Sequence, residues 1–197
     1  LGGDQLVSWV SAIVLLPLAG ALAMFAVPEG NAAQSRAYAL VTSAVTLVLA
    51  CILVGKFDRD SGALQFVDNQ DWAGAAGLAW NVGVDGISLW LVLLTAGLFF
   101  LAIIAAAVRT PERPRAFMGL LLLAECGLLG LFAAGDLVLF YIFWEAMLVA
   151  FAILMWMWGS GERGRATMTF VIYTMIGSLL MLIAILSAAF IAQGPGE

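Results

Sequence analysis

Two glutamates stand inside long apolar stretches of this chain, where an acid needs a function or a polar partner. From Leu137 to Trp158 the sequence is apolar except for Tyr141 and Glu145. At about 1.5 Å per residue this stretch spans a bilayer core of roughly 30 Å and leaves Glu145 near the midplane. A charged residue at that depth costs on the order of 2.5–3.5 kcal/mol even on the mildest insertion scale. We therefore expect Glu145 to take up and release a proton.

Glu125 is the second candidate for proton transfer. A helical hairpin that turns near Gly135 and Asp136 has Glu125 ten residues before Gly135 and Glu145 ten residues after it, so we expect both roughly 15 Å from the turn, at equal depth. If the two carboxylates lie close together, at least one is predicted to be protonated at neutral pH, because desolvation and like charge both disfavour ionisation. Spacing alone leaves open whether they face each other. The alternative for each is a neutral acid that hydrogen-bonds a neighbouring helix.

Hydroxyl groups follow one face of the last apolar segment. Thr167, Thr174 and Ser178 are seven and four residues apart, a spacing that brings them to one side of a helix. Such a stripe can hold water along a proton path, and it is equally typical of helix packing contacts.

The fold class follows from composition and hydropathy. Hydrophobic residues make up 64% and charged residues 11% of the 197 residues, against about 25% charged in soluble domains. We predict an all-α polytopic membrane protein, because a lipid-exposed open strand would leave its backbone groups unsatisfied. Six segments are long enough to cross: Leu6–Val27, Ala37–Gly55, Ile87–Val108, Ala116–Ala134, Leu137–Trp158 and Ala166–Ala192.

The orientation follows from the basic residues. Six of the eight lie after the first, third and fifth segments, and the other two lie between the second and the third. The excess of positive charge on one side predicts that the N-terminus is outside. The chain starts at Leu1 rather than Met, and its last apolar segment runs almost to the end, so we expect a piece of a longer protein.

The long outer segment at 56–86 is acidic and contains Trp72 and Trp80. We interpret it as an ordered external loop with an interfacial piece at these tryptophans, since Trp favours the headgroup zone. It caps the helix ends or binds a ligand.

The absent residue types exclude several kinds of site. The chain has no His, and Cys51 and Cys126 stand alone in apolar runs, which excludes a haem with His ligands and leaves too few thiolates for an iron–sulfur cluster. The glycine-rich stretch at 159–165 lacks the pattern of a phosphate-binding loop. We therefore expect no metal, cofactor or nucleic acid to bind to this chain.

Motifs in the second half resemble the antiporter-like membrane subunits of respiratory complex I, most of all the M-type subunit. The likeness runs over most of residues 80–190, while the first two helices match in character alone. The motifs that carry it are Val84-Asp85-Gly86-Ile87-Ser88-Leu89, Phe140-Tyr141-x-Phe143-Trp144-Glu145-x-Met147-Leu148, Trp158-Gly159, and Phe170-x-Ile172-Tyr173-Thr174-x-x-Gly177-Ser178-Leu179.

The resemblance implies a proton-translocating subunit of NADH:quinone oxidoreductase in a bacterial inner or plasma membrane. Its partners would be the lipid bilayer and other membrane-arm subunits of the complex, and FMN, iron–sulfur clusters and quinone would lie in partner subunits. In that family the fifth-helix glutamate, here Glu145, is a key protonatable residue coupled to lysines on the seventh and eighth helices, which lie outside this chain. Some members also carry a lysine near the start of the sixth helix, where this sequence has Thr169.

The resemblance also implies a division of the chain. Family members have about fourteen membrane helices with two inverted repeats of five. Residues 1–115 would then hold three leading helices with the acidic outer loop at 56–86, and 116–197 the first three helices of a repeat. Two alternatives stay open: a subunit of a sodium/proton antiporter or membrane-bound hydrogenase, which shares this helix pattern, and a scaffold in which Glu145 only packs.

Overall fold

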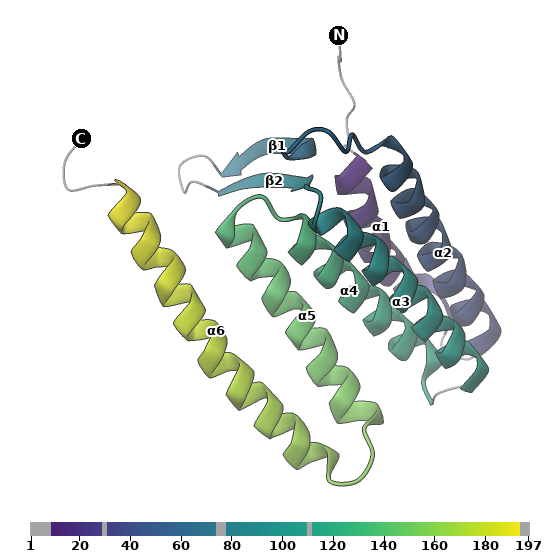
Figure 1. Cartoon of the computed structure of the whole chain (residues 1–197). Coiled ribbons are helices and arrows are strands. Elements are labelled where there is room, and N and C mark those ends of the chain that lie inside the picture. The colour runs from purple at the N-terminus through teal and green to yellow at the C-terminus, as the bar shows by residue number, and fades with distance from the viewer. Residues whose placement is uncertain (1–8, 29–30, 74–77, 110–111, 194–197) are drawn as a thin grey trace.

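Six long helices form the structure, a computed structural model that describes residues 9–28, 31–73, 78–109 and 112–193 (Figure 1). Each is long and apolar enough to cross a membrane, which confirms the predicted spans. Their bounds are Trp9–Ala23 for α1, which continues into a short 3-10 turn η1 (Met24–Ala26), Ala32–Lys56 for α2, Ser88–Arg109 for α3, Pro114–Ala133 for α4, Leu137–Trp158 for α5 and Arg163–Gln193 for α6.

Three helices begin earlier than hydropathy predicts. Helix α2 starts at Ala32 rather than Ala37, α4 at Pro114 rather than Ala116, and α6 at Arg163 rather than Ala166. Hydropathy marks the part of a helix that lies in lipid, whereas the helix itself continues through charged residues into the interface. At the start of α2, the side chain of Asn31 caps the helix by accepting a hydrogen bond from the Gln34 N–H at 3.0 Å.

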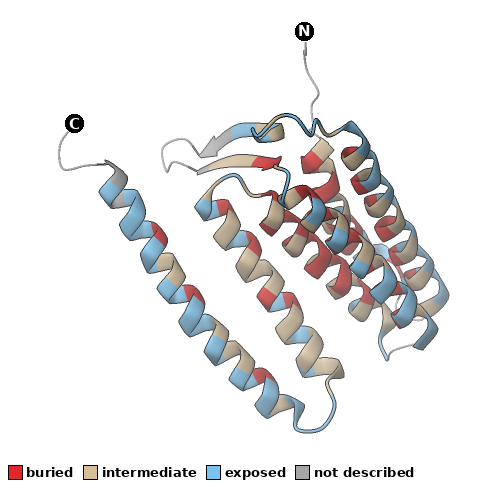
Figure 2. Ribbon diagram, in the orientation of Figure 1, coloured by how far each residue is buried: buried red, intermediate tan, exposed pale blue. Residues whose placement is uncertain are grey.

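Successive helices run in opposite directions, and α4 lies at the centre of the packing (Figure 1). It contacts α1, α2, α3 and α5, and its core side chains Leu122, Ala124 and Leu129 are fully buried. Helix α6 packs against α5 and lies at the edge. Figure 2 shows buried residues concentrated in the first four helices and exposed residues along α6.

The outer segment contains two strands that the all-α prediction did not include. Strand β1 (Gln65–Ala73) pairs antiparallel with β2 (Leu78–Val84) across the helix ends where α2 finishes and α3 begins (Figure 1). An open hairpin is permitted there because it lies beyond the predicted spans, where water can satisfy its outer edges. The expectation of an ordered segment fits this hairpin; the side chain of Trp72 lies outside the described residues.

Side-chain hydrogen bonds attach the hairpin to α1. The Trp80 indole N–H donates to Ser11 Oγ at 2.8 Å, and Ser11 Oγ donates to Asp68 Oδ2 at 2.6 Å. Val82 forms a bridge with Ala134, directly after α4. The hairpin thus connects the first helix with the turn that precedes α5.

Glycine allows α4 and α5 to approach closely. A Cβ placed on Gly127 would lie 3.0 Å from the Met147 backbone nitrogen, and one on Gly130 would overlap the ring of Phe143. Phe143 also packs edge-on against Trp80, with ring centroids 5.9 Å apart. These contacts fix how α5 is rotated against α4.

Aspartates cap the starts of α3 and α5. Asp85 Oδ1 accepts hydrogen bonds from the N–H groups of Ile87 and Ser88, at 3.0 and 2.7 Å, and the Asp85 N–H donates to Ser88 Oγ at 2.8 Å. Asp136 Oδ1 accepts from Val138 and Leu139, both at 2.8 Å. Both carboxylates satisfy N–H groups that have no partner within the helix.

Replacing Gly130 with Ala is expected to destabilise the protein by about 1–3 kcal/mol, because the new methyl group overlaps the Phe143 ring and forces the helices apart. Gly97→Ala in α3 is the matched control, since nothing lies within 4 Å of its added Cβ. The measurement is unfolding of the purified protein in detergent. Equal stability of the two variants would contradict the packing described for Gly130.

The hydrogen bonds from Ser88 and Ile87 hold the pKa of Asp85 below the ordinary value of 3.8, against a smaller opposing effect of burial. Since the folded-state pKa is the lower one, the ionised cap stabilises the protein fully above about pH 4, and this contribution is lost as pH falls through the folded-state value. Asp85→Asn should remove this acid-dependent loss, and Asp85→Ala should also cost about 1 kcal/mol at neutral pH. Thermal unfolding in detergent as a function of pH measures both effects; identical pH profiles for the parent and Asp85→Asn would refute this.

Candidate site in the membrane helices

Glu145 is half-buried in α5, on the side of the helix away from α4. Phe143, two residues earlier, is buried against Gly130 of α4. Two residues correspond to about 200° of rotation around a helix. The Glu145 side chain therefore projects from the opposite side of α5, away from Gly130.

Tyr141 connects Glu145 with α6. It lies one turn before Glu145 on the same side of α5, and its hydroxyl interacts with both the Glu145 carboxylate and Ser178 of α6. Near the other end of the helix pair, a Cβ on Gly164 would lie 3.7 Å from the Trp156 ring. In this antiparallel register, Glu145 is level with Thr174.

The hydroxyl stripe predicted for the last helix faces α5. Of the α6 side chains that the structure describes, Thr167, Ser178 and Ile185 are buried, and Thr174 is half-buried. Thr174 donates to the Phe170 carbonyl at 2.7 Å and Ser178 to the Met175 carbonyl at 3.1 Å. Both hydroxyl groups thus satisfy their protons within α6 and keep lone pairs that can accept a hydrogen bond.

Glu125 lies in the interior of the first four helices. It is 0% exposed, and its Oε1 accepts a hydrogen bond of 3.1 Å from Ser43 Oγ of α2. Its Oε2 is buried, and no hydrogen-bond partner for it lies within the described part of the chain. Among the described residues, Ser43 is therefore the one hydrogen-bond partner of the Glu125 carboxyl group.

The two glutamates belong to different surroundings. Glu125 contacts α2, whereas Glu145 faces α6. Gly127 is level with Met147 and Gly130 with Phe143, so α4 and α5 are offset along their axes. At 1.5 Å per residue, this offset makes the depths of Glu125 and Glu145 differ by roughly 5 Å. The equal depth expected from counting along the chain was wrong, because the two helices are offset along their axes. Glu125 and Glu145 therefore do not form the close pair of carboxylates that mutual repulsion would require.

Two polar partners were missed by sequence reasoning. Tyr141 carries a usable signal, because it stands four residues before Glu145 and residues at this spacing meet on one face of a helix. Ser43 carries none, since it lies 82 residues before Glu125 and only packing brings them together. In the described part of the chain, no three His, Cys, Asp or Glu side chains come together as a metal site would require.

Comparison with known proteins shows which proteins this chain resembles. The family model described as "NADH:quinone oxidoreductase/Mrp antiporter, TM" matches residues 134–194, which include all of α5 and α6. NAD(P)H-quinone oxidoreductase chain 4 2 of Microcystis aeruginosa is 37% identical over 187 residues, which cover 94% of this chain and 34% of that protein. This chain is thus similar to members of the NADH:quinone oxidoreductase/Mrp antiporter family over most of its own length. NADH-quinone oxidoreductase subunit M of Rhodobacter capsulatus, another relative, is 38% identical over 93% of this chain and 36% of its own length.

Solved structures of similar membrane subunits agree with the family. A chain of respiratory complex I from Thermus thermophilus superposes with a TM-score of 0.79 at 36% identity, over 94% of this chain and 37% of that one. A chain of an archaeal membrane-bound sulfane sulfur reductase shares the fold, with a TM-score of 0.71 at 19% identity over 88% and 35% of the two chains. The present chain spans about a third of the length of the relatives and solved chains that it matches.

The comparisons extend the resemblance found in the sequence. The motifs indicated a likeness over residues 80–190, whereas the relatives align over 94% of the chain and thus include the first helices. Those helices escaped notice because lipid-facing apolar residues can replace one another with little physical cost, so that only hydropathy remains visible in a single sequence.

Ser43→Ala is expected to destabilise the protein by about 1–3 kcal/mol, because it leaves both oxygens of the buried Glu125 carboxyl without a partner. Thr46→Val is the matched control, since the Thr46 hydroxyl bonds only to the Thr42 carbonyl of its own helix among the hydrogen bonds observed. Unfolding of both variants in detergent, and of Ser43→Ala combined with Glu125→Leu, measures the effect. If the double variant is no more stable than Ser43→Ala, the loss does not come from Glu125.

Proposed function

We propose that this chain is part of a proton-translocating membrane subunit of an NADH:quinone oxidoreductase, and that Glu145 is its protonatable residue. The observation that supports this most strongly is the surroundings of Glu145. An acid in a membrane-spanning helix interacts with Tyr141 and lies level with a hydroxyl stripe on the neighbouring helix. Acids are retained at membrane depth chiefly where they pair with polar groups or serve proton paths.

The residues of this chain would move a proton between hydrogen-bonded groups. When Glu145 is ionised, the Tyr141 hydroxyl donates to the carboxylate; when Glu145 is protonated, that hydroxyl is released toward Ser178. Tyrosine has a single proton to donate, so each proton step at Glu145 reorients Tyr141. No bond of NADH or quinone is made or broken in this chain, and FMN, the iron–sulfur clusters and quinone belong to partner subunits in this proposal.

Glu125 enters the proposal as a second proton-binding group, separate from the Glu145 site. Its support is the buried Oε2 for which the described residues supply no partner. Because Glu125 is enclosed by the first four helices, a proton would reach it past Ser43 rather than from the α5–α6 side. Glu145→Gln and Glu125→Gln should therefore act independently of each other.

The arrangement in the membrane is part of the same proposal. We place the protein in a bacterial inner or plasma membrane with the N-terminus outside. The basic residues of the α3–α4 and α5–α6 connections then lie inside, opposite the hairpin (Figure 1). Residues 1–115 would be the leading helices and 116–197 the start of a repeat. The other membrane-arm subunits of the complex would be its protein partners.

A second function is favoured by one observation: the family model that matches residues 134–194 also covers Mrp antiporters. A subunit of a sodium/proton antiporter or a membrane-bound hydrogenase would use the same acid and hydroxyl groups. Purification of the full-length protein under mild conditions distinguishes these functions. Co-purification of flavin- and iron–sulfur-containing subunits with NADH:quinone activity supports the first proposal, and their absence supports the second.

Glu145→Gln in the full-length subunit is expected to lower proton translocation by the assembled complex on the order of 10²-fold, because the amide cannot carry the proton. Tyr141→Phe should have a smaller effect in the same direction, since Glu145 keeps its own proton and loses one donor. The measurement is NADH-driven acidification of sealed vesicles, with complex assembly verified by native electrophoresis.

The control is Glu162→Gln, which removes a highly exposed carboxylate in the α5–α6 connection and should leave pumping unchanged. Normal proton translocation by assembled Glu145→Gln complex would refute the role of Glu145. It would favour the scaffold alternative, in which this side chain only packs.

A further inference from the structure

Trp80 of β2 connects the extramembrane hairpin with the helix that carries Glu145. Its ring packs edge-on against Phe143 of α5, with ring centroids 5.9 Å apart, and Phe143 stands two residues before Glu145. A Cβ placed on Gly130 of α4 would overlap the same Phe143 ring. Phe143 is therefore in contact with the hairpin and with α4 at once.

The indole of Trp80 is held by α1. Its N–H donates to Ser11 Oγ at 2.8 Å, and Ser11 Oγ donates to Asp68 Oδ2 of β1 at 2.6 Å. A tryptophan that only anchors a protein at the membrane surface presents its polar end to headgroups or water, whereas the Trp80 N–H bonds within the protein. Trp80 is half-buried, while Trp90, near the start of α3, is 53% exposed. This contrast indicates a packing role for Trp80.

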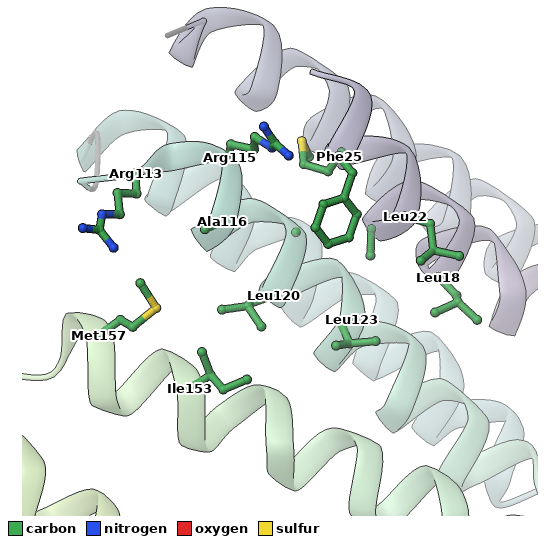
Figure 3. Close-up of a pocket in the computed structure, with 13 residues that line it drawn as sticks. Leu18, Leu22, Phe25, Arg113, Arg115, Ala116, Leu120, Leu123, Ile153 and Met157 are labelled. Carbon is green, nitrogen blue, oxygen red and sulfur yellow. The ribbon is translucent and has the colours of Figure 1, made fainter. Parts of the chain in front are cut away.

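The contact between α4 and α5 is close at the hairpin end and open farther along. Ile153 and Met157 of α5 line a pocket of about 720 Å³ that they share with α1 and α4 (Figure 3). At the last residue of α5, the Trp158 indole attaches the helix again, to the connection before α4. Glu145 lies two residues from Phe143 and thirteen from Trp158, so its direction depends mainly on the contacts at the hairpin end.

A small rotation of α5 is enough to disturb the contact with α6. A side chain that ends roughly 5 Å from the helix axis moves by about 2 Å when the helix rotates by about 20°. The Tyr141 hydroxyl interacts with both Glu145 and Ser178 of α6. Rotation carries Tyr141 and Glu145 together relative to Ser178, and a shift of this size takes a hydrogen bond beyond the distance at which it forms.

We propose that Trp80 is a positioning residue for the Glu145 site. By holding Phe143 in place, it keeps α5 in the rotation at which Tyr141 meets Ser178. The inference rests on the proposed role of Glu145 and adds to that site a residue of the extramembrane segment, which acts through Phe143 rather than by contact with the acid.

The test compares Trp80→Ala with Trp90→Ala in the assembled complex that contains the full-length subunit. Proton translocation per assembled complex is measured as NADH-driven acidification of sealed vesicles. Trp80→Ala is expected to lower it by about two- to tenfold, the range by which the loss of one aromatic pair shifts an equilibrium, and Trp90→Ala should leave it unchanged. If Trp80→Ala does not assemble, Trp80→Leu takes its place with the same expectation. Unchanged translocation in the Trp80 variant would overturn the proposal.

A double variant tests whether Trp80 acts through Phe143. Phe143→Leu removes the aromatic partner, so adding Trp80→Ala to it should cause little further loss of translocation, whereas independent sites would multiply their losses. Multiplied losses would contradict the proposal, because Trp80 would then act by another route.

Infrared difference spectra separate this inference from the role of Glu145 in pumping. The carboxyl signal of Glu145 is identified by its loss in Glu145→Gln, and we expect Trp80→Ala to shift this signal, because rotation of α5 changes the hydrogen bonds around the acid. A purely structural role of Trp80 would lower the amount of assembled complex and leave the signal in place, which would refute the positioning role. Normal pumping by Glu145→Gln beside a shifted signal would refute the proposed function and leave the contact from Trp80 to the Glu145 site as inferred.

Discussion

The cost of placing an acid among membrane helices governs this structure. Glutamate in a low-dielectric interior is tolerated only beside groups that hydrogen-bond it. The buried Glu125 and the half-buried Glu145 meet this requirement differently. Glu125 is enclosed by four helices and receives one hydrogen bond from Ser43. Glu145 lies at the border between the packed helices and α6, beside Tyr141. Among the described helices, the first acid is enclosed by α1 to α4, whereas the second lies between α5 and α6.

The extramembrane hairpin determines where the second acid stands. The Gly135 N–H donates to the Asn81 carbonyl at 2.7 Å, and Asp136 then caps α5. These bonds fix the residue at which α5 starts, and the start of a rigid helix fixes the depth of every residue along it. The contact of Gly130 with Phe143 fixes the rotation. The contact of the hairpin with Gly135, ten residues before Glu145, therefore sets the depth of this acid, and Gly130 in α4 sets the direction of its side chain.

The six helices and their order could be predicted from the sequence, because a run of apolar residues long enough to cross lipid can form few structures other than a helix. The hairpin was missed because β1 is rich in Asp, Asn and Gln and shows no clean alternation of polar and apolar residues. The motif Val84-Asp85-Gly86-Ile87-Ser88 was recognised as a family likeness, and the structure gives its physical reason as a helix cap. The relative rotation of α4 and α5 required knowledge of side-chain packing, which residue counting does not provide.

In the proposed relay, two acceptors compete for the single hydroxyl proton of Ser178 on α6, and this competition can control proton transfer at Glu145. The Ser178 hydroxyl has one proton, which it donates to the Met175 carbonyl, while its oxygen interacts with Tyr141. Donation toward Tyr141 would require Ser178 to give up the carbonyl bond, a net cost of about 1 kcal/mol. A small movement of α6 along α5 changes that balance, since hydrogen bonds weaken steeply with misalignment. The α5–α6 contact is therefore the place where a shift between these two helices would act on Glu145.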